Sequence, residues 1–339
     1  MSFLRKAALT TTAVVMSAAL AACSNSESVG TTDAAITIQH AYGETVIENT
    51  PERVATVAWG NHEVPLALGV MPVGMTKATW GDDDNDGMLP WVAEAVEKQG
   101  GEPPVLFDEA DALPYEEIAA TEPDVILASY SGITQEEYDQ LSKIAPTVAF
   151  PKQAWTTTMD EMISMSAKAM GKEEEGKQLI ADLDKQINDE FAAHPGLKGK
   201  SYLFTSFGSG QDLSKIGFYT IDDPRGGFLK DNGLEVPKVV KEKSGEAENF
   251  WVEVSAENTE LFDYVDFFIT YGSNNDAENQ KQLKAMQKDP LVGRIPAIKQ
   301  GRVAFIGEGP VAASANPSPL GIPWGLSDYL DKLETAATK

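Results

Sequence analysis

The residue types that most often do chemistry in proteins are sparse in this chain. It has one cysteine and three histidines among 339 residues. His40, His62 and His194 stand far apart, and the last is followed by Pro195. A transition-metal site takes several His, Cys or carboxylate ligands that converge on one point. We therefore expect neither a resident metal ion nor a cofactor.

Two stretches resemble functional motifs but lack a required part. Alternating carboxylates from Asp82 to Gly87 could surround calcium, yet the twelfth position is Ala93, where a closing carboxylate should stand. We interpret the run as a solvated loop. Residues 206–210, Ser-Phe-Gly-Ser-Gly, lack the flanking pattern of a hydrolase nucleophile, and no acid–base partner is evident. We predict that the protein is not an enzyme.

The single cysteine, Cys23, follows a Leu-Ala-Ala stretch and an uncharged segment preceded by Arg5 and Lys6. A basic start, a short apolar core and small residues before the cut are typical of a secretory signal. A cysteine at the cut indicates a bacterial lipoprotein, whose thiol carries the lipid. We expect residues 1–22 to be removed and Cys23 to anchor the chain outside a cell membrane; an ordinary signal peptide is the alternative.

The chain is strongly acidic. Removal of residues 1–22, which hold two basic and no acidic side chains, takes the formal charge from −25 to −27. Such a charge disfavours nucleic acid or an anionic lipid surface as a partner. Residues 23–35 are small and polar without an apolar period, which predicts a flexible linker between the lipid and the folded part.

The ordered part begins with α/β patterns. Residues 36–47 alternate apolar and polar side chains around a glycine, which predicts a hairpin. Residues 53–58 are typical of a buried strand. A short helix with Asn61 as its N-cap should follow and end at Gly69, before a strand near Val73. Strand, helix and strand in this order indicate an α/β lobe.

Two later stretches repeat one order of elements. In residues 113–132, Glu116 stands at a helix start and a buried strand follows. In residues 255–272, Ser255 is the expected N-cap, Glu257 stands at the helix start, and a second buried strand follows. Both strands end in a tyrosine and a polar loop. The helix dipole favours a glutamate there by up to about 1 kcal/mol. That explains each residue locally, but not why both precede matching strands.

The middle of the chain is helical. Residues 158–194 have no strand character, and Gly171 interrupts the pattern. Five apolar residues fall on one helical face: Leu179, Ile180, Leu183, Ile187 and Phe191. One long helix should therefore join two α/β lobes and allow only modest opening.

Several stretches together carry a resemblance to a known family. They are 50–54, 67–74, Glu116 within PYEEIAATEPDVIL, the connecting helix, 206–208, 251–257 and 318–329. The order and spacing of these stretches resemble those of the bacterial ABC-importer substrate-binding proteins of the iron-siderophore and vitamin B12 type. These are the class III periplasmic binding proteins. The resemblance covers nearly all of the mature chain, and 318–329 look most like siderophore members.

The resemblance implies two α/β lobes with a ligand cleft between them. We expect an N-terminal lobe at 36–152, a connecting helix region at 153–196 and a C-terminal lobe at 197–339. Such proteins hand their ligand to a membrane permease coupled to an ATPase. One glutamate on each lobe docks on permease arginines, and the matching residues here are Glu116 and Glu257.

The candidate ligand contacts are mostly aromatic. Parallel α/β sheets bind ligands beyond the carboxyl ends of their strands. This rule selects Trp59, Tyr130, Phe207 and Tyr271. A pocket tryptophan of vitamin-binding relatives matches Trp251. We add four residues that stand in predicted polar loops, where a large side chain has little core to fill: Trp80, Trp155, Tyr219 and Arg225.

The ligand class follows from charge. A trianionic ferric catecholate needs several paired cations when it is desolvated, and Arg225 is the basic residue that we place in the cleft. We therefore favour a ferric hydroxamate siderophore bound by a monomer that delivers it to an ABC importer. Catecholate, haem and cobalamin remain alternatives, as does a non-transport sensory lipoprotein of the same fold.

Overall fold

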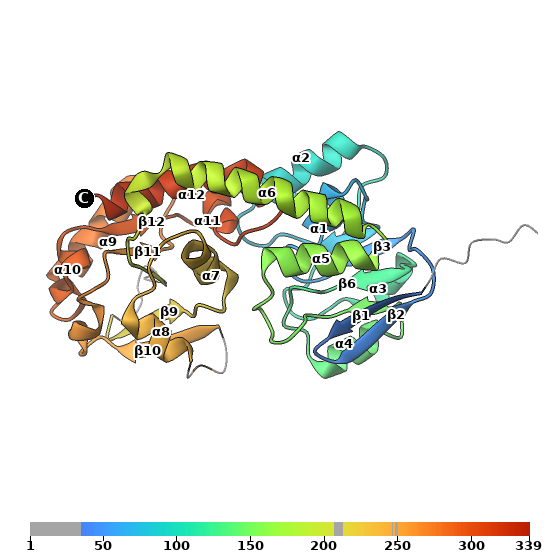
Figure 1. Cartoon of the computed structure of the whole chain (residues 1–339), viewed down its shortest axis with the longest axis horizontal. Coiled ribbons are helices and arrows are strands. Elements are labelled where there is room, and N and C mark those ends of the chain that lie inside the picture. The colour runs from blue at the N-terminus through green and yellow to red at the C-terminus, as the bar shows by residue number, and fades with distance from the viewer. Residues whose placement is uncertain (1–34, 207–212, 246, 248–249) are drawn as a thin grey trace, which may run out of the picture. The chain divides into compact units, whose positions relative to one another are not determined.

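The computed structural model describes residues 35–206, 213–245, 247 and 250–339 (Figure 1). These described residues form one compact unit. In the described part of the chain, no helix is both long and apolar enough to cross a membrane.

The N-terminal part holds a hairpin and a parallel sheet. The predicted hairpin is confirmed as β1 (Ile36–His40) and β2 (Gly43–Ile47), which pair antiparallel. A five-stranded parallel sheet follows in the order β5-β4-β3-β6-β7. Its strands are β3 (Val54–Thr56), β4 (Gly74–Thr76), β5 (Val105–Phe107), β6 (Val125–Leu127) and β7 (Thr147–Val148). β3 and β6 are buried throughout, as expected of parallel strands covered on both faces.

Helices alternate with these strands. They are α1 (Glu63–Ala67), α2 (Pro90–Gln99), α3 (Tyr115–Ala120), α4 (Gln135–Leu141) and α5 (Met159–Ala169). The predicted N-cap at Asn61 is wrong, because α1 has His62 at that position and no side-chain cap. The buried Asn61 amide instead donates to the Val57 and Tyr130 carbonyls, each at 2.8 Å. It thus joins the loops that follow β3 and β6.

The C-terminal part is built on a mixed sheet in the order β10-β9-β8-β11-β12. Its strands are β8 (Tyr202–Thr205), β9 (Lys215–Tyr219), β10 (Trp251–Ser255), β11 (Phe267–Thr270) and β12 (Val303–Phe305). β9 is antiparallel to both neighbours, while β8, β11 and β12 are parallel. Its helices are α7 (Pro224–Asp231), α8 (Lys238–Ser244), α9 (Asp276–Lys288), α10 (Pro296–Lys299), α11 (Pro310–Ser314) and α12 (Gly321–Ala337).

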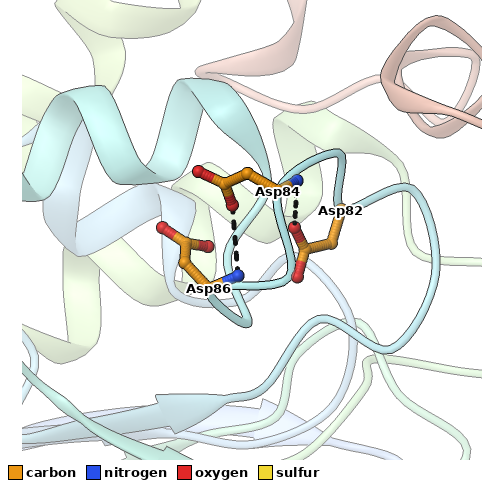
Figure 2. A group of neighbouring side chains, drawn as sticks. All are labelled: Asp82, Asp84 and Asp86. Atoms are coloured by element: carbon orange, nitrogen blue, oxygen red, sulfur yellow. Dashed lines mark hydrogen bonds between the residues drawn. The ribbon is translucent and has the colours of Figure 1, made fainter.

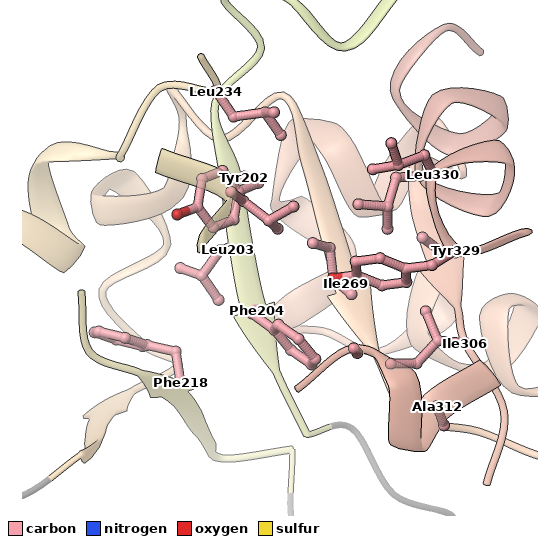
Figure 3. Close-up of a cluster of buried hydrophobic side chains, with 14 of the residues drawn as sticks. Tyr202, Leu203, Phe204, Phe218, Leu234, Ile269, Ile306, Ala312, Tyr329 and Leu330 are labelled. Atoms are coloured by element: carbon pink, nitrogen blue, oxygen red, sulfur yellow. The ribbon is translucent and has the colours of Figure 1, made fainter. Parts of the chain in front are cut away.

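The core of this part lies between the central strands and α12. Figure 3 shows Leu203 and Phe204 of β8 and Ile269 of β11 beside Tyr329 and Leu330 of α12. All five are almost inaccessible to solvent. Burying each large apolar side chain contributes about 1.5–3 kcal/mol, so this layer fixes the strands whose ends carry site residues.

A long helix joins the two sheets. The predicted break at Gly171 is confirmed, because this residue adopts φ +68° between α5 and α6 (Glu173–Ala193). α6 packs on α5 near its start, where Gly176 leaves room for Ala167. Beyond its end, the Gly196 N–H donates to the Glu334 carboxylate of α12 at 2.6 Å.

A second helix accompanies this connection. α12 begins against the N-terminal part, where the buried Glu63 carboxylate of α1 accepts hydrogen bonds from the backbone N–H groups of Leu320 (3.0 Å) and Gly321 (3.3 Å). The indole N–H of Trp91 donates to the other carboxylate oxygen at 2.9 Å. α6 thus joins the two sheets along the chain, as expected, and the hydrogen bonds of Glu63 add a contact between α1 and the start of α12.

Candidate ligand-binding site

Arg225 is the polar centre of the candidate site. Its guanidinium makes a two-point ion pair with Asp223, at 2.8 Å from Nε and 2.7 Å from Nη2. Asp223 is fully buried and also caps α7. Burial alone would lower the pKa of Arg225, but the hydrogen bonds and charge of Asp223 outweigh it and raise that pKa well above its usual range. Arg225 therefore stays charged, but with its charge paired.

Two tyrosines meet the free edge of this guanidinium. Arg225 Nη1 donates to the hydroxyl groups of Tyr219 at 3.0 Å and Tyr271 at 3.4 Å, and these hydroxyls lie 3.2 Å apart. The guanidinium carbon also lies 3.8 Å from the centre of the Tyr219 ring. β9 and the loop after β11 bring the two tyrosines together. Tyr271 lies just beyond a parallel strand, as the strand-end rule predicted, whereas Tyr219, predicted in a polar loop, is the last residue of the antiparallel strand β9.

Aromatic rings extend from the tyrosines to the N-terminal part. Trp80 meets Tyr271 edge-on at 5.6 Å and lies 6.2 Å from Trp59, measured between ring centres. On the other side, Trp251 of β10 packs edge-on to Tyr219 at 4.9 Å, and its indole covers Gly217. Offset or edge-on pairs at such distances are favourable for aromatic rings. Residues far apart in the chain thus form one continuous aromatic surface.

Tyr130 and Trp155 form a second aromatic pair. Their rings meet edge-on at 5.3 Å, and the Asn316 amide donates to the Tyr130 hydroxyl at 3.1 Å. Burial raises the pKa of Tyr130 to about 12. Trp155 adopts φ +62°, which is unusual for a non-glycine residue, and its indole lies over Gly132. A side chain at Gly132 would occupy the space of this indole.

A carboxylate that the sequence analysis missed holds the loop before Trp59. Glu109 accepts from the Ala58 N–H at 2.9 Å and from the Thr76 hydroxyl at 2.8 Å. Thr76 also donates to the Ala58 carbonyl at 3.0 Å. Ala58 adopts φ +61°, and these bonds fix that strained conformation. Burial, partly offset by the two hydrogen bonds, raises the pKa of Glu109 to about 6.

Three of the aromatic residues line two neighbouring cavities. One of about 410 Å³ is lined by Trp59, Trp155 and Glu109, and another of about 410 Å³ is lined by Trp80. The two share Lys77, so they are adjacent. A larger cavity of about 620 Å³ between α5, α6 and α7 is lined by polar, charged and apolar residues and includes none of the predicted contacts that the structure describes. We place the site at the cavity of Trp59 and Trp155, since its lining is mainly apolar, as in most ligand pockets. The Arg225 cluster lines neither cavity and is joined to them by the Trp80–Tyr271 contact.

The two candidate docking glutamates are exposed and lie in different parts of the fold. Glu116 is in the first turn of α3, as predicted. The prediction of a helix that starts after Ser255 is wrong. The Ser255 hydroxyl instead accepts a hydrogen bond from the Glu257 N–H at 3.3 Å in a turn. A short 3-10 helix, Thr259–Phe262, follows without a side-chain cap.

Two predicted functional residues, Cys23 and Phe207, lie outside the described residues. Among the described residues, Asp82, Asp84 and Asp86 are the carboxylates close enough together to share a cation (Figure 2). Each accepts backbone N–H bonds within this loop; Asp82, for example, accepts from Asn85 and Gly87 at 2.8 Å. These bonds hold the conformation of the loop, and its interpretation as a solvated loop stays a prediction.

The fold and the sequence define the class of the protein. Residues 54–309 match the periplasmic binding protein family, and the chain belongs to it. The two-lobed α/β architecture that we predicted is confirmed by this match and by solved structures of the class III type.

Particular relatives are similar over most of the chain. The crystal structure of PiaA from Streptococcus pneumoniae in complex with ferrichrome has 45% sequence identity and a TM-score of 0.83, covering 89% of this chain and 99% of PiaA. The probable siderophore-binding lipoprotein YfiY of Bacillus subtilis is 29% identical, covering 83% of this chain and 84% of YfiY. The iron(3+)-hydroxamate-binding protein YxeB of Bacillus subtilis is 28% identical over 58% of this chain and 59% of YxeB.

Proposed function

We propose that this protein captures a ferric hydroxamate siderophore outside the cell and delivers it to an ABC importer. The observation that carries the proposal is the aromatic surface around Arg225, to which both sheets contribute. A ferric trihydroxamate is a neutral chelate with apolar faces, so rings can cover it while one or two donors bind its oxygens. The similarity to PiaA in complex with ferrichrome supports the same class of ligand.

The charge balance also favours hydroxamate over catecholate. Arg225 is already paired with the buried Asp223, which leaves no net positive charge in this pair. A trianionic ferric catecholate desolvated there would meet one ammonium, that of the exposed Lys77, against its three negative charges. The protein itself carries out no covalent step in this proposal.

Membrane attachment and docking complete the proposed role. A lipid on Cys23 would tether the protein, as the lipoprotein names of relatives support. Glu116 and Glu257 are exposed and free to meet arginines of a permease. Exposed ion pairs contribute about 0.2–1 kcal/mol each, so their role would be orientation rather than tight binding. We propose that the protein acts as a monomer.

The experiment is a tryptophan-fluorescence titration of residues 24–339 with four ligands: a ferric trihydroxamate, a ferric catecholate, cobalamin and haem. Trp59, Trp80 and Trp155 lie in the candidate site and report binding. We expect saturable quenching below the micromolar range with the trihydroxamate and a weak response to its iron-free form. Tighter binding of any other ligand in the panel would overturn the ligand class.

A further inference from the structure

The cavity at Trp59 and Trp155 contains more negative than positive charge. Three carboxylates line it, those of Glu109, Asp111 and Glu137, and one ammonium, that of Lys77. Lys77 and Asp111 are exposed, so water screens them. Glu137 is partly buried, but its carboxylate accepts hydrogen bonds from Thr134 at the start of α4. Glu109 is therefore the least screened charge that is not part of a helix cap.

The contacts of Glu109 leave its charge uncompensated. Its two carboxylate oxygens accept from the neutral Ala58 N–H and the neutral Thr76 hydroxyl. No cation is within salt-bridge distance of it in the described part of the chain. By contrast, the Arg225 charge is cancelled by Asp223. The fixed charge that remains beside the aromatic surface is thus negative.

We infer that Glu109 is a specificity determinant, which makes the cleft prefer ferric chelates with a pendant cationic group and disfavour those with an anionic one. The inference rests on the proposed function and refines its ligand class. A single fixed charge acting at about 10 Å near a protein surface changes affinity roughly tenfold for each charge on the ligand.

A matched ligand series tests this inference without changing the iron centre. Ferrioxamine B carries a free ammonium beside its ferric trihydroxamate; its N-acetyl derivative is neutral there, and its N-succinyl derivative carries a carboxylate. Residues 24–339 would be titrated with all three at low ionic strength and pH 7.5. We expect affinity to fall from the ammonium chelate to the acetyl chelate and again to the succinyl chelate. Glu109→Gln should reduce the ratio of affinities between successive chelates roughly tenfold.

The control is Glu136→Gln, which removes the same charge from an exposed position on α4 that does not line the cavity. This variant should keep the order of the three affinities. Because burial raises the pKa of Glu109 to about 6, the preference of the wild type should also weaken as pH falls through that value.

The outcomes separate the two claims. If Glu109→Gln changes all three affinities by one factor, Glu109 only positions the Ala58 loop and the inference is wrong. Equal affinities in the wild type, or affinity ratios that are unchanged in the variant, also contradict it. If the wild type binds none of the three chelates, the proposed function fails together with the inference that rests on it.

Discussion

Arg225 and Asp223 form a two-point ion pair beneath the aromatic surface, with Nε to Oδ1 at 2.8 Å and Nη2 to Oδ2 at 2.7 Å. The carboxylate is fully buried, whereas 18% of the arginine side chain is exposed. This geometry orients the third guanidinium edge toward Tyr219 and Tyr271. The pair thus holds the guanidinium against the two tyrosines while it leaves no net positive charge there.

Breaking this pair from one side should cost stability. Arg225→Ala leaves the buried Asp223 charge unpaired, and we expect a loss of about 3 kcal/mol in the free energy of unfolding. Urea denaturation measures it. The double variant Asp223→Ala with Arg225→Ala is the control and should be more stable than Arg225→Ala alone. A double variant that is no more stable than the single one would contradict the unpaired-charge explanation.

Gly132 should be required for the position of Trp155. A β-carbon at Gly132 would lie 2.1 Å from the Trp155 Nε1, so Gly132→Ala must displace the indole. We expect ferric trihydroxamate affinity to fall about tenfold, equivalent to about 1.4 kcal/mol. In a Trp155→Ala background, Gly132→Ala should have little further effect on affinity. Equal losses in both backgrounds would show that Gly132 acts by another route.

His62 should make the fold sensitive to acid. It is buried, its Nδ1 has no hydrogen-bond partner among the described residues, and burial lowers its pKa to about 4. In the unfolded chain His62 binds this proton near pH 6.5. Its contribution to the free energy of unfolding is therefore complete above pH 6.5, and about 3 kcal/mol is lost as pH drops toward 4.

Urea unfolding of the wild type and His62→Asn at several pH values between 4 and 7.5 measures this term. The difference between the two proteins should change with pH in that window. Groups common to both, such as Glu109, cancel in the difference. A difference that stays constant with pH would show that His62 does not titrate as proposed.

The docking role of the exposed glutamates predicts a defect in transport alone. Glu116→Lys with Glu257→Lys should reduce siderophore-dependent iron uptake by cells several-fold, because two ion pairs become repulsive. Chelate affinity should not change, because neither residue lines a cavity of the candidate site. Glu117→Lys with Glu260→Lys, also exposed, is the control for charge and should support normal uptake. Normal uptake by cells that carry Glu116→Lys with Glu257→Lys would exclude the docking role.

Local patterns predicted the regular elements well. Runs of apolar residues predicted β6 and β11, and alternating apolar and polar residues predicted the β1–β2 hairpin. Gly171 predicted the break before α6. The strand-end rule also selected Tyr271, which lies beside Tyr219. These features depend on residues close in sequence or on a general rule of parallel sheets.

The missed residues depend on tertiary contacts. Glu109 stands between Asp108 and Asp111 in an acidic loop, and only its bonds to Ala58 and Thr76 set it apart. Asn61 looked like a helix cap but bonds to loops far apart in sequence. Glu63 bonds to residues more than 250 positions away. Spacing along the chain carries no signal for such contacts.

We propose that the aromatic surface around Arg225 binds a neutral ferric trihydroxamate. Titration calorimetry of residues 24–339 with ferrichrome tests it most directly, with the iron-free ligand as control. We predict one site per chain and a dissociation constant below about 1 μM, equivalent to a binding free energy beyond about −8.2 kcal/mol, with much weaker binding of the iron-free form. No measurable heat, or equal affinity for both forms, would contradict the account.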